Sequence, residues 1–221
     1  MAKNAVIFGT GSLAEVVRFY LDRDSDYRVV GFTASDDRIN ADSFRNLPLV
    51  PFSRATVDFP PDRHEMFIAI GYAKLNRLRE QFATEARGKG YRLLSYVCSK
   101  ATTWGDTVIG DNVFIFEDNT IQPFIEIGDG TILWSGNHVG HHSKVGPFCF
   151  LTSHVVISGH CRIGARCFFG VNSTVADSTS IADDNLIGPG TLIQKDTQPG
   201  EAYIAERTAK FPKPSSIFFR W

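Results

Sequence analysis

The sequence of 221 residues lacks long apolar runs, an excess of charge of either sign and a cysteine-rich framework. Without a run of about 18 apolar residues, a membrane-spanning helix is excluded. The 23 basic and 24 acidic side chains leave a formal net charge of −1, which argues against a nucleic-acid or anionic membrane partner. The apolar stretch Ala5–Phe8 is shorter than the roughly 7–15 apolar residues of a signal peptide. We therefore expect a cytoplasmic protein without membrane insertion.

The first part of the chain, residues 1–97, alternates short apolar runs with helical patterns. Strands are predicted at Ala5–Phe8, Arg28–Phe32, Met66–Ile70 and Leu93–Val97, and helices at Leu13–Leu21 and Asn76–Arg87. Residues 33–64 read as irregular because they are rich in Asp, Asn and Pro. This order predicts an α/β domain with a parallel sheet, equivalent to half of a Rossmann-like fold.

From residue 101 the pattern changes to a period of six. Counted from Thr107, the third residue of each hexad is apolar fifteen times in succession, at 109, 115, 121, 127, 133, 139, 145, 151, 157, 163, 169, 175, 181, 187 and 193. The first position also points inward and is mostly small, and the fourth is often glycine, as a corner with a permissive backbone would prefer. Six residues make a strand and a turn, and three such faces close a triangular coil. We predict a parallel β-helix over residues 98–200, an all-β solenoid.

The remaining segment, residues 201–221, is aromatic and punctuated by proline. An exposed cluster of this size would be a liability, so we expect this tail to pack on the last coil or on a neighbouring subunit.

The four cysteines do not predict a metal site. Cys149, Cys161 and Cys167 occupy the inward first position, where they pack as small apolar residues. The C-x₂-C spacing of zinc sites is absent. His142, His154 and His160 are separated by 6, 12 and 18 residues, which does not fit the three-histidine site of β-helical carbonic anhydrases. We expect His142 and His160, eighteen residues apart, to stack on the same corner in successive coils, with His154 on another corner. We expect no metal cofactor.

The N-terminal domain carries a candidate phosphate-binding turn. Gly9, Gly11 and Ser12 lie between a strand and a helix, where backbone N–H groups can receive a phosphate, although a tight turn alone also favours glycine. Tyr72 and Asn76 follow another strand, at the carboxyl edge where open α/β sheets bind ligands. Arg79 either belongs to this edge or, as we favour, is a solvated residue of the following helix. Because 97 residues make only half of a dinucleotide-binding fold, a sugar nucleotide is favoured over NAD.

Three segments carry a resemblance to a known family: Asn137–Gly146, Phe168–Ser173 and Ile181–Asp184. The hexad region resembles the left-handed β-helix acyltransferases, and together with the small N-terminal domain it looks like the NeuD/PglD-type sugar acetyltransferases. The resemblance implies a left-handed β-helix, acetyl-CoA as co-substrate, a nucleotide-linked amino sugar as acceptor and a homotrimer with active sites between neighbouring subunits. It also implies a role in surface glycan biosynthesis, such as that of lipopolysaccharide or O-antigen.

The resemblance places the general base at His141. A protonated amine cannot attack a thioester, so a group that titrates near neutral pH must accept a proton as the C–N bond forms. The next residue is usually acidic in the family, but here it is His142, which could accept a hydrogen bond while neutral. Phe150 stands where some relatives have a second histidine. His154 either takes over part of that role from another corner or is an exposed surface residue.

Three glycines complete the candidate site. By the family pattern, the backbone N–H of Gly159 would stabilise the thioester oxyanion, with a plain corner glycine as the alternative. Gly188 and Gly190 are candidate contacts for coenzyme A, because glycine permits close approach. The sequence therefore predicts an acetyl-CoA-dependent N-acetyltransferase acting on a nucleotide-linked amino sugar. A sugar O-acetyltransferase on the same scaffold and a non-catalytic nucleotide-sugar-binding protein remain the alternatives.

Overall fold

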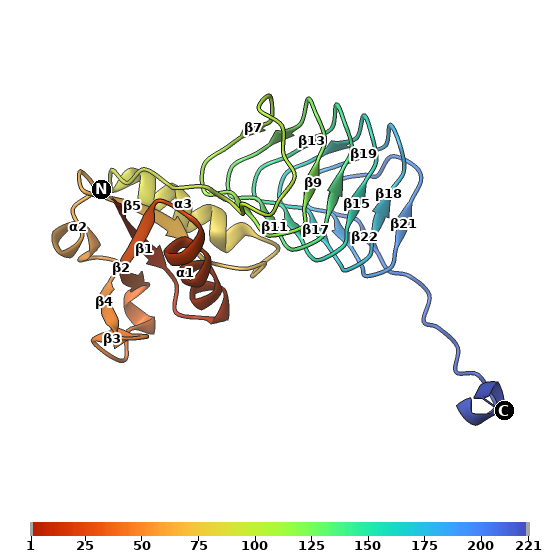
Figure 1. Ribbon diagram of the computed structural model, residues 1–221, viewed down its shortest axis with the longest axis horizontal. Coiled ribbons are helices and arrows are strands. Elements are labelled where there is room, and N and C mark those ends of the chain that lie inside the picture. Colours follow the sequence, from red (N-terminus) through yellow and green to blue (C-terminus); the bar gives the residue numbers. More distant parts are fainter. Residues whose placement is uncertain (1, 220–221) are drawn as a thin grey trace.

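A computed structural model describes residues 2–219, which form an α/β unit and a β-helix (Figure 1). The α/β unit contains one sheet in the order β3-β4-β2-β1-β5. Its strands are β1 Lys3–Phe8, β2 Tyr27–Ala34, β3 Ser43–Phe44, β4 Leu47–Pro51 and β5 His64–Ile68. Its helices are α1 Ser12–Asp24, α2 Ala55–Asp58 and α3 Arg77–Gly88, with a 3₁₀ turn η1 at Asp36–Arg38. All pairings are parallel except that of β3 with β4, which confirms the α/β fold class.

The segment 33–64 is more regular than its composition indicates. Strand β4 pairs with β2, with Leu49 opposite Phe32, and helix α2 follows it. Two prolines, Pro48 and Pro51, obscure β4 in the sequence, because proline cannot donate to a strand ladder and usually marks an edge or a turn. The expectation of an irregular segment is therefore wrong for β4 and α2.

The β-helix consists of three parallel sheets in which neighbouring strands are eighteen residues apart, except that Leu186 pairs with Ala202, sixteen residues on. The first face contains β6 Tyr96–Val97, β8 Phe114–Ile115, β11 Ile132–Leu133, β14 Phe150–Leu151, β17 Phe168–Phe169, β20 Leu186–Ile187 and β22 Ala202–Tyr203. The second contains β9 Thr120–Ile121, β12 His138–Val139, β15 Val156–Ile157, β18 Thr174–Val175 and β21 Leu192–Ile193. The third contains β7 Val108–Ile109, β10 Glu126–Ile127, β13 Lys144–Val145, β16 Arg162–Ile163 and β19 Ser180–Ile181. The hexad pattern is thus confirmed as a left-handed β-helix.

A single apolar core fills the β-helix. It is made by the third-position residues together with the apolar residues at the first position. Cys149, Cys161 and Cys167 are fully buried in this core, as expected from their inward phase.

The corner glycines serve a different purpose from the one expected. Left-handed backbone conformations occur at the sixth position of the hexads, for example at His142 with φ +59°. The fourth-position glycines are required instead by close contact between coils, because a Cβ on Gly140 would lie 2.5 Å from the backbone carbon of Ser158. The prediction of a permissive backbone at the fourth position is therefore wrong.

The two parts of the molecule share the segment 93–97. Leu93 bridges to Met66 in the α/β unit, whereas β6 pairs with β8 in the β-helix. Leu93–Val97 is therefore not one strand of the first domain, because the chain passes within it from one sheet to the other. The β-helix begins at Tyr96, two residues before the expected boundary.

The first face of the β-helix is covered by the α/β unit, and we call it the docked face. Phe67 of β5 and Phe114 of β8 have ring centroids 5.2 Å apart. The Tyr20 hydroxyl of α1 donates to Glu117 at 2.5 Å, beside the second-face edge of the docked face. One apolar cluster joins α1, the inner strands and the outward side chains of the docked face.

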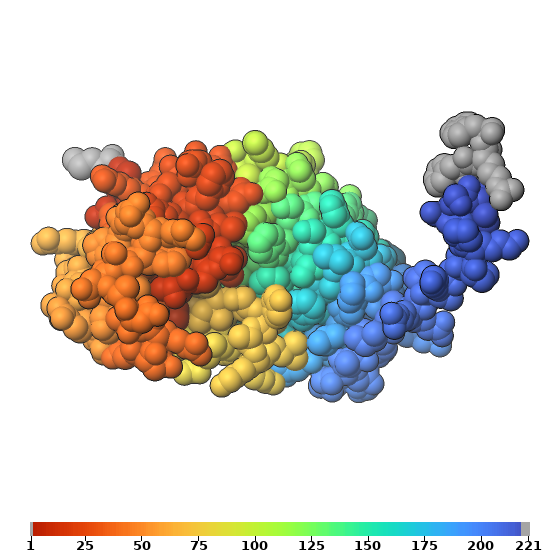
Figure 2. All heavy atoms as spheres, turned by 90° about the horizontal axis from the view of Figure 1, so that it is seen from below, coloured from red at the N-terminus to blue at the C-terminus, as the bar shows by residue number. Residues whose placement is uncertain are grey.

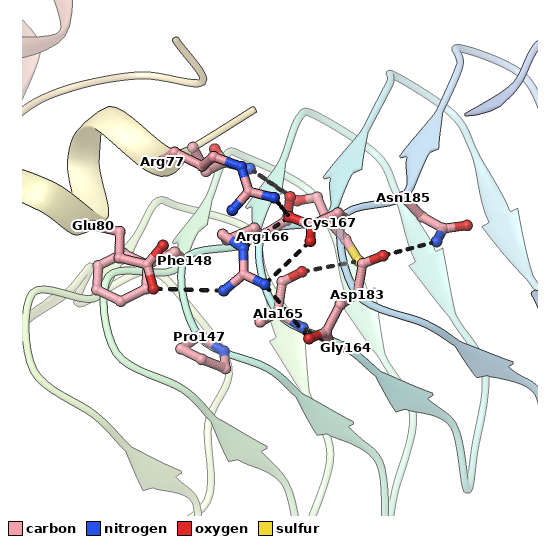
Figure 3. Close-up of polar contacts among 12 residues, drawn as sticks. Arg77, Glu80, Pro147, Phe148, Gly164, Ala165, Arg166, Cys167, Asp183 and Asn185 are labelled. Carbon is pink, nitrogen blue, oxygen red and sulfur yellow. Dashed lines mark hydrogen bonds and ion pairs between the residues drawn. The ribbon is translucent and has the colours of Figure 1, made fainter. Parts of the chain in front are cut away.

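Helix α3 lies along the opposite edge of the docked face, between the rest of the α/β unit and the coils (Figure 2). Arg166 of the β-helix lies 3.5 Å from Glu80 of α3 (Figure 3). On its other side Arg166 lies 2.8 Å from Asp184 of the next coil. The Arg166 hydrogen bond holds the pKa of Asp184 below its ordinary value. Farther along α3, Arg87 pairs with Asp111 at 3.1 Å and Asp129 at 2.7 Å.

The C-terminal segment leaves the β-helix after β22. It runs away from the last coil and ends in the 3₁₀ turn η2, Ser215–Phe219 (Figure 1). The expected packing on the last coil is therefore not what the structure shows beyond β22, whereas packing on a neighbouring subunit stays a prediction. Residues 220–221 of the predicted tail lie outside the described part of the chain. No helix within residues 2–219 has both the length and the apolar character needed to cross a bilayer.

Candidate active site

The triangular coil has three corners, and the corner between the second and third faces lies opposite the docked face. We call it the histidine corner. It consists of residues 122–124, 140–142, 158–160, 176–178 and 194–196 in successive coils. Because the α/β unit covers only the opposite face and its edges, this corner is open in a single chain.

His141 lies at the middle of this corner and is exposed. Its backbone N–H donates to Gln122 Oε1 at 2.8 Å in the preceding coil, and its carbonyl accepts from His160 N–H at 2.9 Å in the following coil. The imidazole Nδ1 lies 3.1 Å from Nδ1 of His142. One of these two nitrogens must therefore donate and the other accept, which fixes the two rings relative to each other.

His142 and His160 occupy equivalent positions in successive coils. Their rings are stacked, with centroids 5.0 Å apart and planes inclined by 17°. Phe124 lies on the other side of His142, with ring centroids 4.6 Å apart. The expected stacking of these two histidines is present, and the His160 ring also lies edge-on to His141 at 5.0 Å.

Gly159 lies directly beneath the His141 ring. A Cβ at this position would be 3.0 Å from His141 Cε1, 3.2 Å from Nε2 and 3.0 Å from Asp177 Oδ1. Both His141 Nε2 and the Asp177 carboxylate therefore flank the small space above this glycine. Among residues 2–219 the Gly159 N–H has no hydrogen-bond acceptor, whereas the equivalent N–H of Ala165 is taken by Asp183.

The remaining predicted residues of the β-helix lie elsewhere. His154, Gly188 and Gly190 share the corner between the docked and second faces, so one chain does not bring them to His141. Gly188 has a structural reason to be glycine, because a Cβ there would lie 3.0 Å from the Tyr203 carbonyl oxygen. Gly190 adopts φ +68° with open space around it.

The glycine turn has the predicted position between β1 and α1. Gly9 has φ +130°, and a Cβ on it would lie 2.9 Å from the Ala69 carbonyl oxygen, so this glycine is needed for packing. Gly11 is the N-cap of α1, without a side-chain hydrogen bond to the first turn, and a Cβ on it would meet open space. Gly11 and Ser12 thus leave the start of α1 open to an anion.

The edge residues after β5 differ in their roles. Tyr72 is 58% exposed and packs against Phe150 and Phe168 on the docked face, with ring centroids 5.2 and 5.0 Å away. Asn76 is fully buried and donates to the carbonyls of Arg166 and Cys167. The prediction that Asn76 binds substrate is therefore wrong, because its side chain is used to join the two parts of the chain.

Arg79 is also buried rather than solvated. Its guanidinium donates to Asn76 Oδ1 and to five backbone carbonyls, those of Ile70, Gly71, Gly130, Phe148 and Cys149. Burial lowers the pKa of Arg79 to about 9, which leaves it charged at neutral pH. The carbonyl dipoles compensate this charge in place of a carboxylate.

Sequence reasoning missed one member of the histidine corner, Asp177. The available signal was the eighteen-residue coil repeat, which places Asp177 two coils from His141. A hollow of about 610 Å³ lies elsewhere, along α1, lined by Glu15, Arg18, Phe19, Asp22, Arg23 and Arg45. None of these six residues belongs to the histidine corner.

Comparison with known proteins gives the same fold. Residues 106–141 match the family model described as bacterial transferase hexapeptide (six repeats). A mutant of perosamine N-acetyltransferase from Caulobacter crescentus, in complex with CoA and GDP-perosamine, is 26% identical with a TM-score of 0.83, covering 93% of this chain and 95% of that one. PerB from Caulobacter crescentus, in complex with the same two compounds, is 26% identical with a TM-score of 0.82.

The acetyltransferase domain of PglB from Neisseria gonorrhoeae is similar in fold, with 21% identity and a TM-score of 0.81 over 92% of this chain and 97% of that one. The coil, its hexads and these likenesses define the class of protein: an acyltransferase of the left-handed β-helix, hexapeptide-repeat type. Within that class the chain resembles sugar acetyltransferases such as perosamine N-acetyltransferase.

Proposed function

We propose that this enzyme transfers the acetyl group of acetyl-CoA to the amine of a nucleotide-linked amino sugar, as a step in surface glycan biosynthesis. The observation that carries the proposal is the exposed His141, held over Gly159 and paired with His142 at 3.1 Å. The likeness to an N-acetyltransferase that binds CoA and GDP-perosamine supports the choice of substrates.

His141 acts as the general base. Acetyl-CoA supplies the acetyl thioester; His141 Nε2 accepts a proton from the amine as the amine nitrogen bonds to the thioester carbonyl carbon. For Nε2 to accept, Nδ1 must carry hydrogen and donate to Nδ1 of His142, so His142 is the neutral acceptor. This hydrogen bond orients the imidazole and stabilises its cation, as the more usual acidic neighbour would. The C–S bond of the thioester then breaks, and the protonated His141 gives its proton to the departing thiolate, so that CoA leaves as the free thiol.

Gly159 is suited to stabilise the oxyanion. Its N–H has no acceptor among the described residues and lies beside the His141 ring. A free backbone donor aimed at the developing negative charge lowers the barrier without reorganisation. Its missing Cβ leaves room for the reacting group between His141 and the next coil.

The acceptor must reach His141 from a second copy of the chain. The candidate phosphate-binding turn, Gly11 and Ser12, belongs to the unit on the docked face, whereas His141 lies on the opposite corner. A homotrimer with parallel β-helices would place the turn of one subunit near the histidine corner of another. A nucleotide bound at α1 of one copy would then present its sugar amine to His141 of the next.

The test is release of free CoA thiol from acetyl-CoA with a panel of nucleotide-linked sugars. The proposal expects turnover with an amino sugar and an amide in the product by mass spectrometry. Turnover only with sugars that lack an amine, giving an ester, would replace it with O-acetylation. Absence of turnover with every acceptor would contradict both.

A further inference from the structure

The histidine corner brings together three imidazoles from two successive coils. His141, His142 and His160 are all exposed, and each offers one ring nitrogen within 4.8 Å of the others. The spatial arrangement follows from the fold, because His141 and His142 are consecutive and His160 is stacked one coil above His142. The backbone of the corner is fixed by the hydrogen bond from His160 N–H to the His141 carbonyl at 2.9 Å.

Imidazole nitrogens are ligands for Zn²⁺, Cu²⁺ and Ni²⁺, whereas Mg²⁺ and Ca²⁺ prefer oxygen. In a tetrahedral zinc site with bonds of about 2.0–2.1 Å, ligand nitrogens lie roughly 3.3 Å apart. The two Nδ1 atoms of His141 and His142 are already 3.1 Å apart. His160 offers a ring nitrogen within 4.8 Å of the ligand nitrogens of the other two histidines, and this ring is exposed.

A carboxylate lies on the far side of the His141 ring. Asp177 Oδ1 and His141 Nε2 flank the same point above Gly159, at 3.0 and 3.2 Å. When a histidine binds metal through one ring nitrogen, the other commonly donates to a carboxylate, which fixes the tautomer and raises the basicity of the ligand. In this cluster Nδ1 of His141 faces His142, and Nε2 of His141 lies on the side of Asp177.

We propose that His141, His142 and His160 bind a divalent transition metal ion, Zn²⁺, and that the bound ion inhibits the enzyme. The ion binds the lone pair on Nδ1 of His142, which otherwise accepts the hydrogen bond from His141. Bound to the same ion, the His141 ring is held in one position. His141 then cannot shuttle a proton. The binding stands on the geometry alone, and the inhibition also rests on the proposed acetyl transfer.

The binding test is calorimetric titration of ZnCl₂ into the full-length, untagged chain after removal of metals with a chelator. One Zn²⁺ per chain is expected, with affinity reduced more than about tenfold in His160→Asn. His154→Asn is the matched control, because His154 has the same hexad position and φ +60° on another corner, and it should bind as wild type does. Circular dichroism melting shows whether each variant is folded.

Equal affinity for Zn²⁺ in wild type and a folded His160→Asn variant would overturn the proposal, as would loss of binding in His154→Asn. The activity arm adds Zn²⁺ at saturation to the acetyl-transfer assay and then excess chelator, which should restore the rate. Zinc binding without any metal-free turnover would refute the proposed function and leave the metal site standing. Turnover unaffected by saturating Zn²⁺ would refute the inhibition.

Discussion

At the scale of single residues, Gly159 sets how closely the His141 ring can approach the next coil. The space that a side chain would occupy here is shared by His141 and Asp177. The same residue supplies the unpaired N–H that we assign to the oxyanion. Glycine at position 159 therefore has two roles in this account: it allows the His141 ring its position, and it leaves room for the reacting group.

Replacement of Gly159 by alanine should displace the His141 imidazole, since the new methyl group would lie 3.0 Å from Cε1. A shift of about 1 Å in a catalytic group can lower the rate on the order of 100-fold. We expect kcat in the acetyl-transfer assay to fall by roughly 10- to 100-fold. Gly105→Ala, where a Cβ meets open space, is the control and should keep the wild-type kcat. An unchanged kcat in Gly159→Ala would show that the ring position is unimportant.

Single residues differ in how well the sequence reveals them. The inward cysteines and the stacking of His142 on His160 follow from hexad phase alone. The burial of Asn76 and Arg79 could not be predicted in the same way, because the carbonyls that they bind lie up to 91 residues away in the chain. Nothing in the local pattern around α3 indicates that its first turn faces the β-helix.

At the scale of elements, α3 fastens the α/β unit to the coils along one edge of the docked face. The contacts of α3 with the coils are buried near its N-terminus and partly exposed to solvent near its C-terminus. Arg79 near its N-terminus is fully buried among carbonyls, whereas Arg87 near its C-terminus is 35% exposed and pairs with Asp111 and Asp129. The two arginines of one helix therefore offer a direct comparison of buried and exposed interactions.

Arg79→Ala should destabilise the protein by about 3–5 kcal/mol, because it leaves several buried carbonyls without a donor. Arg87→Ala should cost at most about 1 kcal/mol, as expected for partly exposed ion pairs. Urea unfolding followed by circular dichroism measures both. Similar losses in the two variants would mean that the carbonyl cluster around Arg79 does not hold the units together.

The β-helix was predictable at this scale because each hexad repeats one local rule, with the third residue inward. Strand β4 was not, since its place in the sheet depends on pairing with β2 and not on its own proline-containing sequence. The reason why glycine stands at the fourth position of the hexads could not be predicted from the sequence either. The sequence shows where glycine stands, but the contact between coils that requires it is made eighteen residues away.

At the scale of the whole molecule, the docked face and the histidine corner lie on opposite sides of the β-helix. The candidate phosphate-binding turn at Gly11 and the proposed base His141 therefore lie on different sides of one chain. This arrangement predicts that a complete site is made by two copies.

Subunit mixing tests this. Gly11→Phe should block the start of α1 without disturbing packing, because a Cβ there meets open space, and His141→Ala removes the base. Each variant alone should be inactive. Randomly mixed oligomers of the two should recover about a quarter of the wild-type rate, since one site in four combines an intact turn with an intact base. Hybrid oligomers that stay inactive would place the whole site within one chain.

The base itself is tested most directly by kcat for acetyl transfer in His141→Ala, measured as thiol release under saturating substrates. A general base contributes about 10²- to 10⁴-fold, so kcat should fall by that factor while the melting temperature stays unchanged. His64→Asn, in the α/β unit, controls for the loss of a histidine and should keep its activity. A folded His141→Ala enzyme with kcat within about twofold of wild type would contradict the assignment of His141 as the base.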